Sequence, residues 1–133
     1  MRSGGMPVKA GARPPEGGAS AVKVITAILR PDTLEDVTRD LINAGARGVT
    51  ATEVLGFGQQ HGHAPGPFGA ESGAFLLPKL RIDVLVQDRD ATAVAEAIAK
   101  SVRTGVIGDG KIWICPADGA LRVRTGERDD DAV

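Results

Sequence analysis

A strand–helix–strand pattern occurs twice in this 133-residue chain, and this repetition limits the folds that the chain can adopt. The segment 22–29 is rich in β-branched residues, which favour extended backbone, and it predicts a first strand. Leu34, Val37 and Leu41 follow at the spacing of one helix face. A second strand is expected over 48–57, so the first half of the chain indicates the order strand, helix, strand.

The second half of the chain repeats this order. Apolar and polar residues alternate over 80–87, which predicts a half-buried third strand. Asp90 is expected to begin a second helix, and 111–115 predicts a fourth strand. The order is that of a ferredoxin-like βαββαβ sandwich of class α+β, an antiparallel sheet with both helices on one face. Leu85 interrupts the polar side of the third strand, which favours a subunit contact on the other face.

The length of the chain fits one domain with a single core. We expect a disordered leader over 1–21, which is rich in Gly and Pro, and a folded domain over 22–127. A flexible acidic tail is expected over 128–133. Within the domain, 58–74 carries five glycines and two prolines without periodicity, and a segment of this length without regular structure is usually functional or disordered.

Charge and cysteine content exclude several classes of protein. The net charge of −1 argues against a nucleic-acid partner bound by neutralisation of its phosphates, so any anion site must be local. The single cysteine, Cys115, excludes an internal disulfide framework and fits a reducing compartment, so we expect a cytoplasmic protein. No apolar run is long enough to cross a membrane.

A glycine-rich run over 104–111 has the character of an anion-binding loop. Three glycines in the six positions 105–110 leave the backbone N–H groups open to close approach, and Lys111 adds a mobile positive charge. Arg122 and Arg124 stand two residues apart, which places both on one face of an extended segment. Together these residues predict a polyphosphate site. The alternative is a tight turn between a helix and a strand.

These segments resemble the PII signal-transduction proteins, the nitrogen regulatory PII family, over 22–127. The matching segments, in order, are 25–31, 48–54, 56–60, 62–63, 69–71, 77–79, 104–111 and 122–127. The resemblance implies a homotrimer that binds ATP or ADP in the clefts between subunits, with Mg²⁺ and 2-oxoglutarate beside the ATP. It also implies that a long loop, the family's T-loop and here about 58–76, docks on a target enzyme or membrane transporter. Such a protein is a regulator in nitrogen metabolism and not an enzyme, so no catalytic residues are expected.

The resemblance also implies which residues contact the ligands. The glycine-rich run looks like the family's phosphate-contacting loop, with two arginines arriving from the neighbouring subunit. The nucleotide-binding residues that it implies are Ile28, Thr50, Gly56, Gly58, Gln59, Asp83, Leu85, Ile107, Gly108, Asp109, Gly110, Lys111, Arg122 and Arg124. Asp83 stands where a Glu is usual near the base, and its shorter side chain is expected to weaken that contact.

Two further positions correspond to the family's effector site. Gln60 matches the glutamine that ligates Mg²⁺ when ATP and 2-oxoglutarate are bound, and Lys79 matches the lysine that pairs with a 2-oxoglutarate carboxylate. A compact ammonium group suits that pairing. The alternatives are a solvated loop amide at Gln60 and a surface lysine at Lys79.

The chain also departs from the family pattern. Gln59 replaces an arginine beside the phosphates and Val106 replaces a lysine, which predicts weaker ATP binding with ADP or AMP favoured. The chain has no tyrosine, so Ser72 stands at the tyrosine that many members modify and is the remaining candidate for modification. Phe68 replaces the arginine that enters ammonium channels, so we expect it to fit an apolar pocket on a partner. The alternative function is a PII-like sensor of ADP or AMP and bicarbonate that serves carbon uptake or another transporter.

Overall fold

The computed structural model of the chain describes residues 21–58 and 76–133. Its elements are, in order, β1 (Val22–Leu29), α1 (Leu34–Asn43), β2 (Thr50–Gly56), β3 (Leu77–Gln87), α2 (Ala91–Val102) and β4 (Gly110–Ala117). Three short 3₁₀ helices accompany them: η2 (Pro31–Thr33), η3 (Asp88–Asp90) and η4 (Asp129–Ala132). The expected leader up to residue 20 and positions 59–75 of the expected loop lie outside the described residues.

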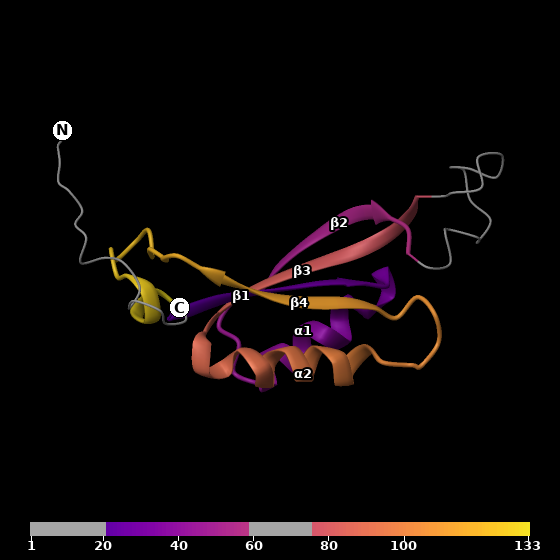
Figure 1. Ribbon diagram of the computed structural model, residues 1–133, viewed down its shortest axis with the longest axis horizontal. Coiled ribbons are helices and arrows are strands. Elements are labelled where there is room, and N and C mark those ends of the chain that lie inside the picture. Colours follow the sequence, from indigo (N-terminus) through magenta and orange to yellow (C-terminus); the bar gives the residue numbers. More distant parts are fainter. Residues whose placement is uncertain (1–20, 59–75) are drawn as a thin grey trace.

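The four strands form one antiparallel sheet in the order β2-β3-β1-β4. Figure 1 shows α1 and α2 together on one side of this sheet, while its other face carries no helix. The arrangement confirms the ferredoxin-like α+β fold that the repeated pattern predicts. Neither helix in the described part of the chain is long and apolar enough to span a membrane.

The hydrophobic core lies between the sheet and the two helices. It is formed by Ile25, Ala27, Leu29, Val37, Leu41, Leu80, Ile82, Val84, Val86, Ala91, Val94, Ile98 and Val102. The alternation predicted for the third strand holds, because Leu80, Ile82 and Val84 are at most 4% exposed. Leu34 is 43% exposed because it begins α1 at the margin of the core.

The first strand spans 22–29 as predicted, and the ends of the other strands differ from the predicted ones by at most three residues. The second strand is expected over 48–57 and spans Thr50–Gly56, and the third begins at Leu77 because 77–79 pairs with 54–56 of β2. Asp90 precedes the first residue of α2 as expected, but its side chain makes no capping hydrogen bond. The helix continues instead from η3.

The segment that follows β4 has a defined place in the structure. The sequence predicts a flexible tail over 128–133, whereas here these residues include the 3₁₀ helix η4. Gln87 Nε2 donates a hydrogen bond to the carbonyl of Asp130 at 3.1 Å, and Arg47 Nη1 donates one to the carbonyl of Val133 at 3.4 Å. These bonds join the end of the chain to β3 and to the segment after α1.

Gly110 allows β4 to pair closely with the end of β1. Its φ is +116°, and a Cβ atom at this position would lie 2.1 Å from the carbonyl oxygen of Ile28. The neighbouring atoms belong to the backbone of a paired strand, so they cannot rotate away. Gly105 also has a positive φ of +84°, but a Cβ atom there would meet nothing within 4 Å.

We therefore expect Gly110→Ala to destabilise the fold far more than Gly105→Ala. The first substitution combines an unfavourable φ with a backbone collision, at a cost of about 3 kcal/mol or more. The second meets only the unfavourable φ, at about 1 kcal/mol. Urea unfolding of both variants measures the difference, and equal losses would contradict the close approach of β4 to β1.

Candidate ligand-binding site

A cavity of about 560 Å³ opens at one end of the sheet. Its lining residues are Ile28, Gly56, Phe57, Gly58, Lys79, Val106, Ile107, Gly108, Asp109, Gly110, Lys111 and Trp113. The volume lies within the range of about 300–1,000 Å³ that is typical of small-molecule sites. Nine of the residues that the resemblance implies for nucleotide or 2-oxoglutarate therefore meet in one cavity.

The antiparallel register explains why all four strands reach this cavity. The last residue of β1, Leu29, pairs with Leu80 near the start of β3 and with Gly110 at the start of β4. The last residue of β2, Gly56, pairs with Leu77 at the start of β3. Two strands thus end, and two begin, at the same end of the sheet.

The cavity combines two cations with an apolar wall. Lys79 enters from β3 and Lys111 from β4. The apolar wall consists of Ile28, Phe57, Val106, Ile107 and Trp113. Such a lining suits a ligand that has an anionic part and a flat or apolar part.

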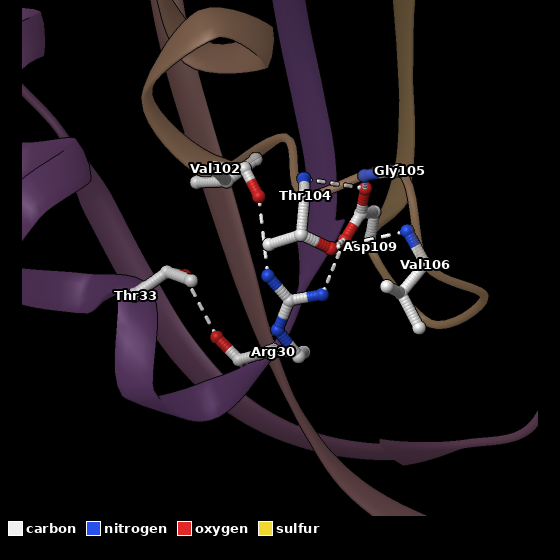
Figure 2. Close-up of polar contacts among 7 residues, drawn as sticks. All are labelled: Arg30, Thr33, Val102, Thr104, Gly105, Val106 and Asp109. Atoms are coloured by element: carbon white, nitrogen blue, oxygen red, sulfur yellow. Dashed lines mark hydrogen bonds and ion pairs between the residues drawn. The ribbon is translucent and has the colours of Figure 1, made fainter.

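The carboxylate of Asp109 organises the loop over 103–109. It accepts hydrogen bonds from the backbone N–H groups of Thr104 and Gly105, each at 2.8 Å, and from the hydroxyl of Thr104. It also forms an ion pair with Arg30, as Figure 2 shows. The loop is therefore folded around the side chain of its own aspartate.

Arg30 connects this loop to both helices. Its Nη2 donates a hydrogen bond to the carbonyl of Val102 at the end of α2, at 3.1 Å. Its own carbonyl accepts hydrogen bonds from the N–H group and the hydroxyl of Thr33, at 3.2 and 2.7 Å. The Arg30 guanidinium and the Thr104 donors hold the pKa of Asp109 well below its ordinary value of 3.8. Asp109 is therefore ionised at neutral pH.

These contacts give the Asp109 carboxylate a role within the loop itself. The resemblance places Asp109 in the phosphate-contacting loop, but its carboxylate is engaged by donors of the loop itself and by Arg30. Within the described part of the chain, the N–H groups of Ile107 and Gly108 make no hydrogen bond, and both residues line the cavity. Asp109 therefore shapes the loop, and its carboxylate leaves the N–H groups at 107–108 without a partner at the cavity wall in the described part of the chain.

Thr50, Asp83 and Leu85 do not line the cavity. Thr50 and Asp83 pair across β2 and β3 on the sheet face that carries no helix. The Asp83 carboxylate accepts a hydrogen bond from the Thr26 hydroxyl at 2.8 Å and one from Arg81 Nε at 2.9 Å, and Arg81 lowers the pKa of Asp83. Leu85 lies on the same face and is 37% exposed.

Arg122 and Arg124 lie beyond the opposite end of the sheet from the cavity. The eight residues of β4 separate them from the loop at 103–109, which corresponds to about 25 Å of extended chain. In Figure 1 that loop, in orange, and the segment after β4, in yellow, are at opposite ends of the molecule. One chain alone therefore does not bring the glycine-rich loop and the two arginines together, because β4 holds them apart. The resemblance implies that the arginines arrive from the neighbouring subunit.

Four predicted residues cannot be placed. Gln59 and Gln60, expected at the phosphates and at Mg²⁺, lie outside the described residues. The partner-binding residues Phe68 and Ser72 do so too. In the ranges 21–58 and 76–133, no group of three or more His, Cys, Asp or Glu side chains is arranged to hold a metal ion.

Three residues of the cavity wall are missing from the sequence-based set: Phe57, Trp113 and Val106, the last of which the sequence marks only as a departure from the family pattern. Phe57 stands between Gly56 and Gly58, both of which the set includes. Trp113 follows Lys111 by two residues in a strand, and this period puts both on one face. The strand period alone is thus enough to find Trp113.

Comparison with known proteins finds similarity to the same family by family model and by individual relatives. A family model described as nitrogen regulatory protein P-II matches residues 22–127. The chain is 44% identical over 112 residues to nitrogen regulatory protein GlnK from Escherichia coli, which covers 84% of this chain and 100% of that protein. It is 42% identical over 112 residues to nitrogen regulatory protein P-II from Synechocystis, with coverage of 84% and 100%.

A solved structure is similar as well. The crystal structure of Arabidopsis thaliana PII bound to citrate superposes with a TM-score of 0.70 and 33% sequence identity. The match covers 86% of this chain and 94% of that one. The similarity therefore extends over nearly the whole fold.

We expect Asp109→Asn to lower the stability of the fold in a pH-dependent way. The folded-state pKa of Asp109 is below 3.8, so its ionised form stabilises the fold fully above that pH. This contribution declines below pH 3.8 and is lost as the pH falls through the folded-state pKa. The difference in free energy of unfolding between wild type and variant should be largest at pH 7 and smaller at pH 3.

Urea unfolding at both pH values measures this difference. Glu96→Gln is a matched control, because it removes one negative charge from an exposed position on α2. The control should behave like wild type at pH 7. A constant difference between wild type and Asp109→Asn at the two pH values would contradict the ion pair.

Proposed function

The chain belongs to the nitrogen regulatory protein P-II family, and on this premise we propose that it is a signalling regulator that binds adenine nucleotide between subunits. Members of this family are signal-transduction regulators rather than enzymes. The nucleotide would be ATP or ADP, and its occupancy would control a target enzyme or transporter in nitrogen metabolism. The long segment between β2 and β3, at about 58–76, would contact that target.

The observation that carries the proposal is the loop at 103–109. Asp109 satisfies the N–H groups of Thr104 and Gly105, while those of Ile107 and Gly108 remain available at the cavity wall. Backbone N–H groups in a glycine-rich turn beside a lysine are suited to phosphate oxygens. Lys111 lies next to this loop at the start of β4. The apolar wall with Trp113 would then accept the base.

Two observations support a homotrimer with nucleotide sites in its clefts. The arginines expected at the phosphates lie far from the cavity of their own chain, so in the proposed assembly a neighbouring subunit would supply them. The face of the sheet without helices carries Thr50, Asp83 and Leu85, which the resemblance also assigns to the nucleotide. A second copy against this face would bring the divided set together, and a ring of copies would repeat the contact.

Lys79 supports an effector beside the nucleotide. It lines the same cavity as Lys111, so a dicarboxylate such as 2-oxoglutarate would find a second cation near the phosphates. Gln60, which would ligate Mg²⁺ there, lies outside the described residues. The Mg²⁺ ion would supply a positive charge shared by phosphate and carboxylate oxygens.

A second candidate function is favoured by Val106. This apolar residue, 68% exposed, lines the cavity where the resemblance implies a lysine. A site with fewer cations favours a nucleotide with fewer phosphates. The alternative is accordingly a sensor of ADP or AMP with bicarbonate that serves a transporter.

We expect Lys111→Met to weaken ATP or ADP binding by about tenfold or more, because it removes a charge-assisted contact to phosphate. Lys100→Met is the matched control, since Lys100 is exposed on α2 and does not line the cavity. Isothermal titration calorimetry of the full chain measures both affinities. Equal losses in the two variants would point to a general charge effect and contradict a site at Lys111.

The same titration separates the two candidate functions. ATP, ADP and AMP are added in turn with Mg²⁺, each with 2-oxoglutarate and then with bicarbonate. Binding of ATP, with 2-oxoglutarate binding only in its presence, supports nitrogen sensing through Lys79 and Gln60. Tighter binding of ADP or AMP, with no heat from 2-oxoglutarate, favours the second candidate. Absence of binding by all three nucleotides would overturn the proposed function.

A further inference from the structure

The segment that follows β4 forms a folded arm, defined here as residues 118–133. Figure 1 shows it in yellow at the end of the sheet opposite the loop at 103–109, which lines the cavity. Leu121 and Arg128 form an antiparallel bridge. Inside it, the N–H group of Arg122 donates to Glu127 at 2.9 Å and that of Gly126 donates to Arg122 at 2.8 Å. The arm is therefore a tight hairpin, and its tip carries Arg122 and Arg124.

Asp129 closes the base of this hairpin through two hydrogen bonds with one residue. Its N–H group donates to the Ala120 carbonyl at 2.9 Å, and its side-chain Oδ1 accepts from the Ala120 N–H group at 3.2 Å. Asp129 has a φ of +53°, the only positive φ at a non-glycine residue in the described ranges. Aspartate tolerates this conformation better than most residues. The two bonds hold Asp129 in an otherwise unfavourable backbone shape.

The residues after Asp129 attach the arm to the rest of the fold. Gln87, the last residue of β3, donates to the carbonyl of Asp130 at 3.1 Å. Arg47 donates to the carbonyl of Val133 at 3.4 Å. Asp129 thus lies between the hairpin and its attachment, so its conformation sets the direction in which the hairpin points.

The two arginines at the tip are held differently. Arg122 Nε lies 3.3 Å from Glu127 Oε1, and the Thr125 hydroxyl donates to the same oxygen at 2.8 Å. In the described part of the chain, Arg124 has no ion-pair partner and is exposed. Val123 between them is 95% exposed. The hairpin therefore holds the Arg122 guanidinium against Glu127 and leaves that of Arg124 exposed, without an ion-pair partner among the described residues.

We propose that Asp129 is a positioning residue for ligand binding, which sets the hairpin so that Arg122 and Arg124 reach an anionic ligand in the cavity of a neighbouring subunit. This inference rests on the proposed nucleotide function. Asp129 acts only through the two arginines and does not touch the ligand. Its own negative charge would otherwise weaken the binding of a phosphate, so removal of the charge alone cannot explain a loss of affinity.

The test compares three variants of the full chain by calorimetry with ADP and ATP. Asp129→Ala removes the side-chain acceptor and the tolerance of positive φ, so we expect about tenfold weaker binding. Asp129→Asn keeps an acceptor oxygen and tolerates that φ, so it should restore most of the affinity. Asp131→Ala is the matched control: it removes the same charge from an exposed residue of the arm and should bind like wild type.

A double-substitution cycle separates positioning from a general loss of structure. In a chain that already carries Arg122→Ala and Arg124→Ala, we expect Asp129→Ala to cause no further loss of affinity. Thermal unfolding verifies that each variant folds. If Asp129→Ala does not fold, Gln87→Ala takes its place, because it releases the arm from β3 without altering the hairpin, and the same non-additivity is expected.

The outcomes distinguish the proposed nucleotide binding from the positioning role of Asp129. Wild-type protein that binds neither ADP nor ATP would overturn the proposed function and, with it, the part given to Asp129. Wild-type binding together with unchanged affinity in Asp129→Ala would overturn the positioning inference alone. A further loss in the chain without the two arginines would also overturn it, because Asp129 would then act by another route.

Discussion

The ion pair between Arg30 and Asp109 is the interaction on which the rest of the candidate site depends. It joins the end of β1 to the loop at 103–109, and the same arginine donates to Val102 at the end of α2. A loop with several glycines loses much conformational entropy when it folds, so it needs strong local contacts to hold one shape. The Asp109 carboxylate provides them by accepting from four donors at once. The N–H groups at 107–108 are available to a ligand because other donors satisfy this carboxylate.

The antiparallel sheet imposes the second constraint. Its register gathers the ends of β1 and β2 and the starts of β3 and β4 around the cavity, and it places the arm 118–133 at the opposite end. A chain of this topology holds the glycine-rich loop and the arginine hairpin apart, so one chain cannot form the proposed site from both. Contact between different surfaces of two copies would join them, and contacts of that kind give a ring when the rotation between copies closes. The division of the site within one chain is therefore a physical argument for the assembly proposed above.

The sequence predicts the fold well because its signals are local. The alternation over 80–86 and the helical spacing of Val37 and Leu41 indicate which apolar side chains face the core. The structure buries the apolar residues at these positions. The roles of charged residues are harder to predict from the sequence, because they depend on partners that are far away along the chain. Nothing within the run 104–111 reveals that the Asp109 carboxylate faces Arg30, which lies 79 residues earlier in the chain. In the same way, the spacing of Arg122 and Arg124 predicts a shared face but not the end of the sheet at which they lie. No sequence pattern identifies Asp129, because its positioning role arises from a positive φ that only the folded hairpin requires.

The attachment points of the long segment at 59–75 relate the cavity to the part of the chain that is proposed to contact a target. The segment leaves the described fold at Gly58, which lines the cavity, and returns at Leu76, directly before β3 and three residues before Lys79. The segment therefore leaves from the cavity wall at one end, and at the other end it enters β3 three residues before Lys79 of that wall. A ligand that contacts Gly58 or Lys79 would act close to both ends of the segment, so the proposed coupling needs no long chain of intermediate residues. In the proposed function, the size of this coupling would be set by the difference between a ligand's affinities for two states of the protein. In the proposed site, two nucleotides that differ by one phosphate would differ most at the N–H groups of 107–108 and at Lys111, which line the same cavity as Gly58. The groups that would distinguish the ligands thus share one cavity with the residue from which the reporting segment departs.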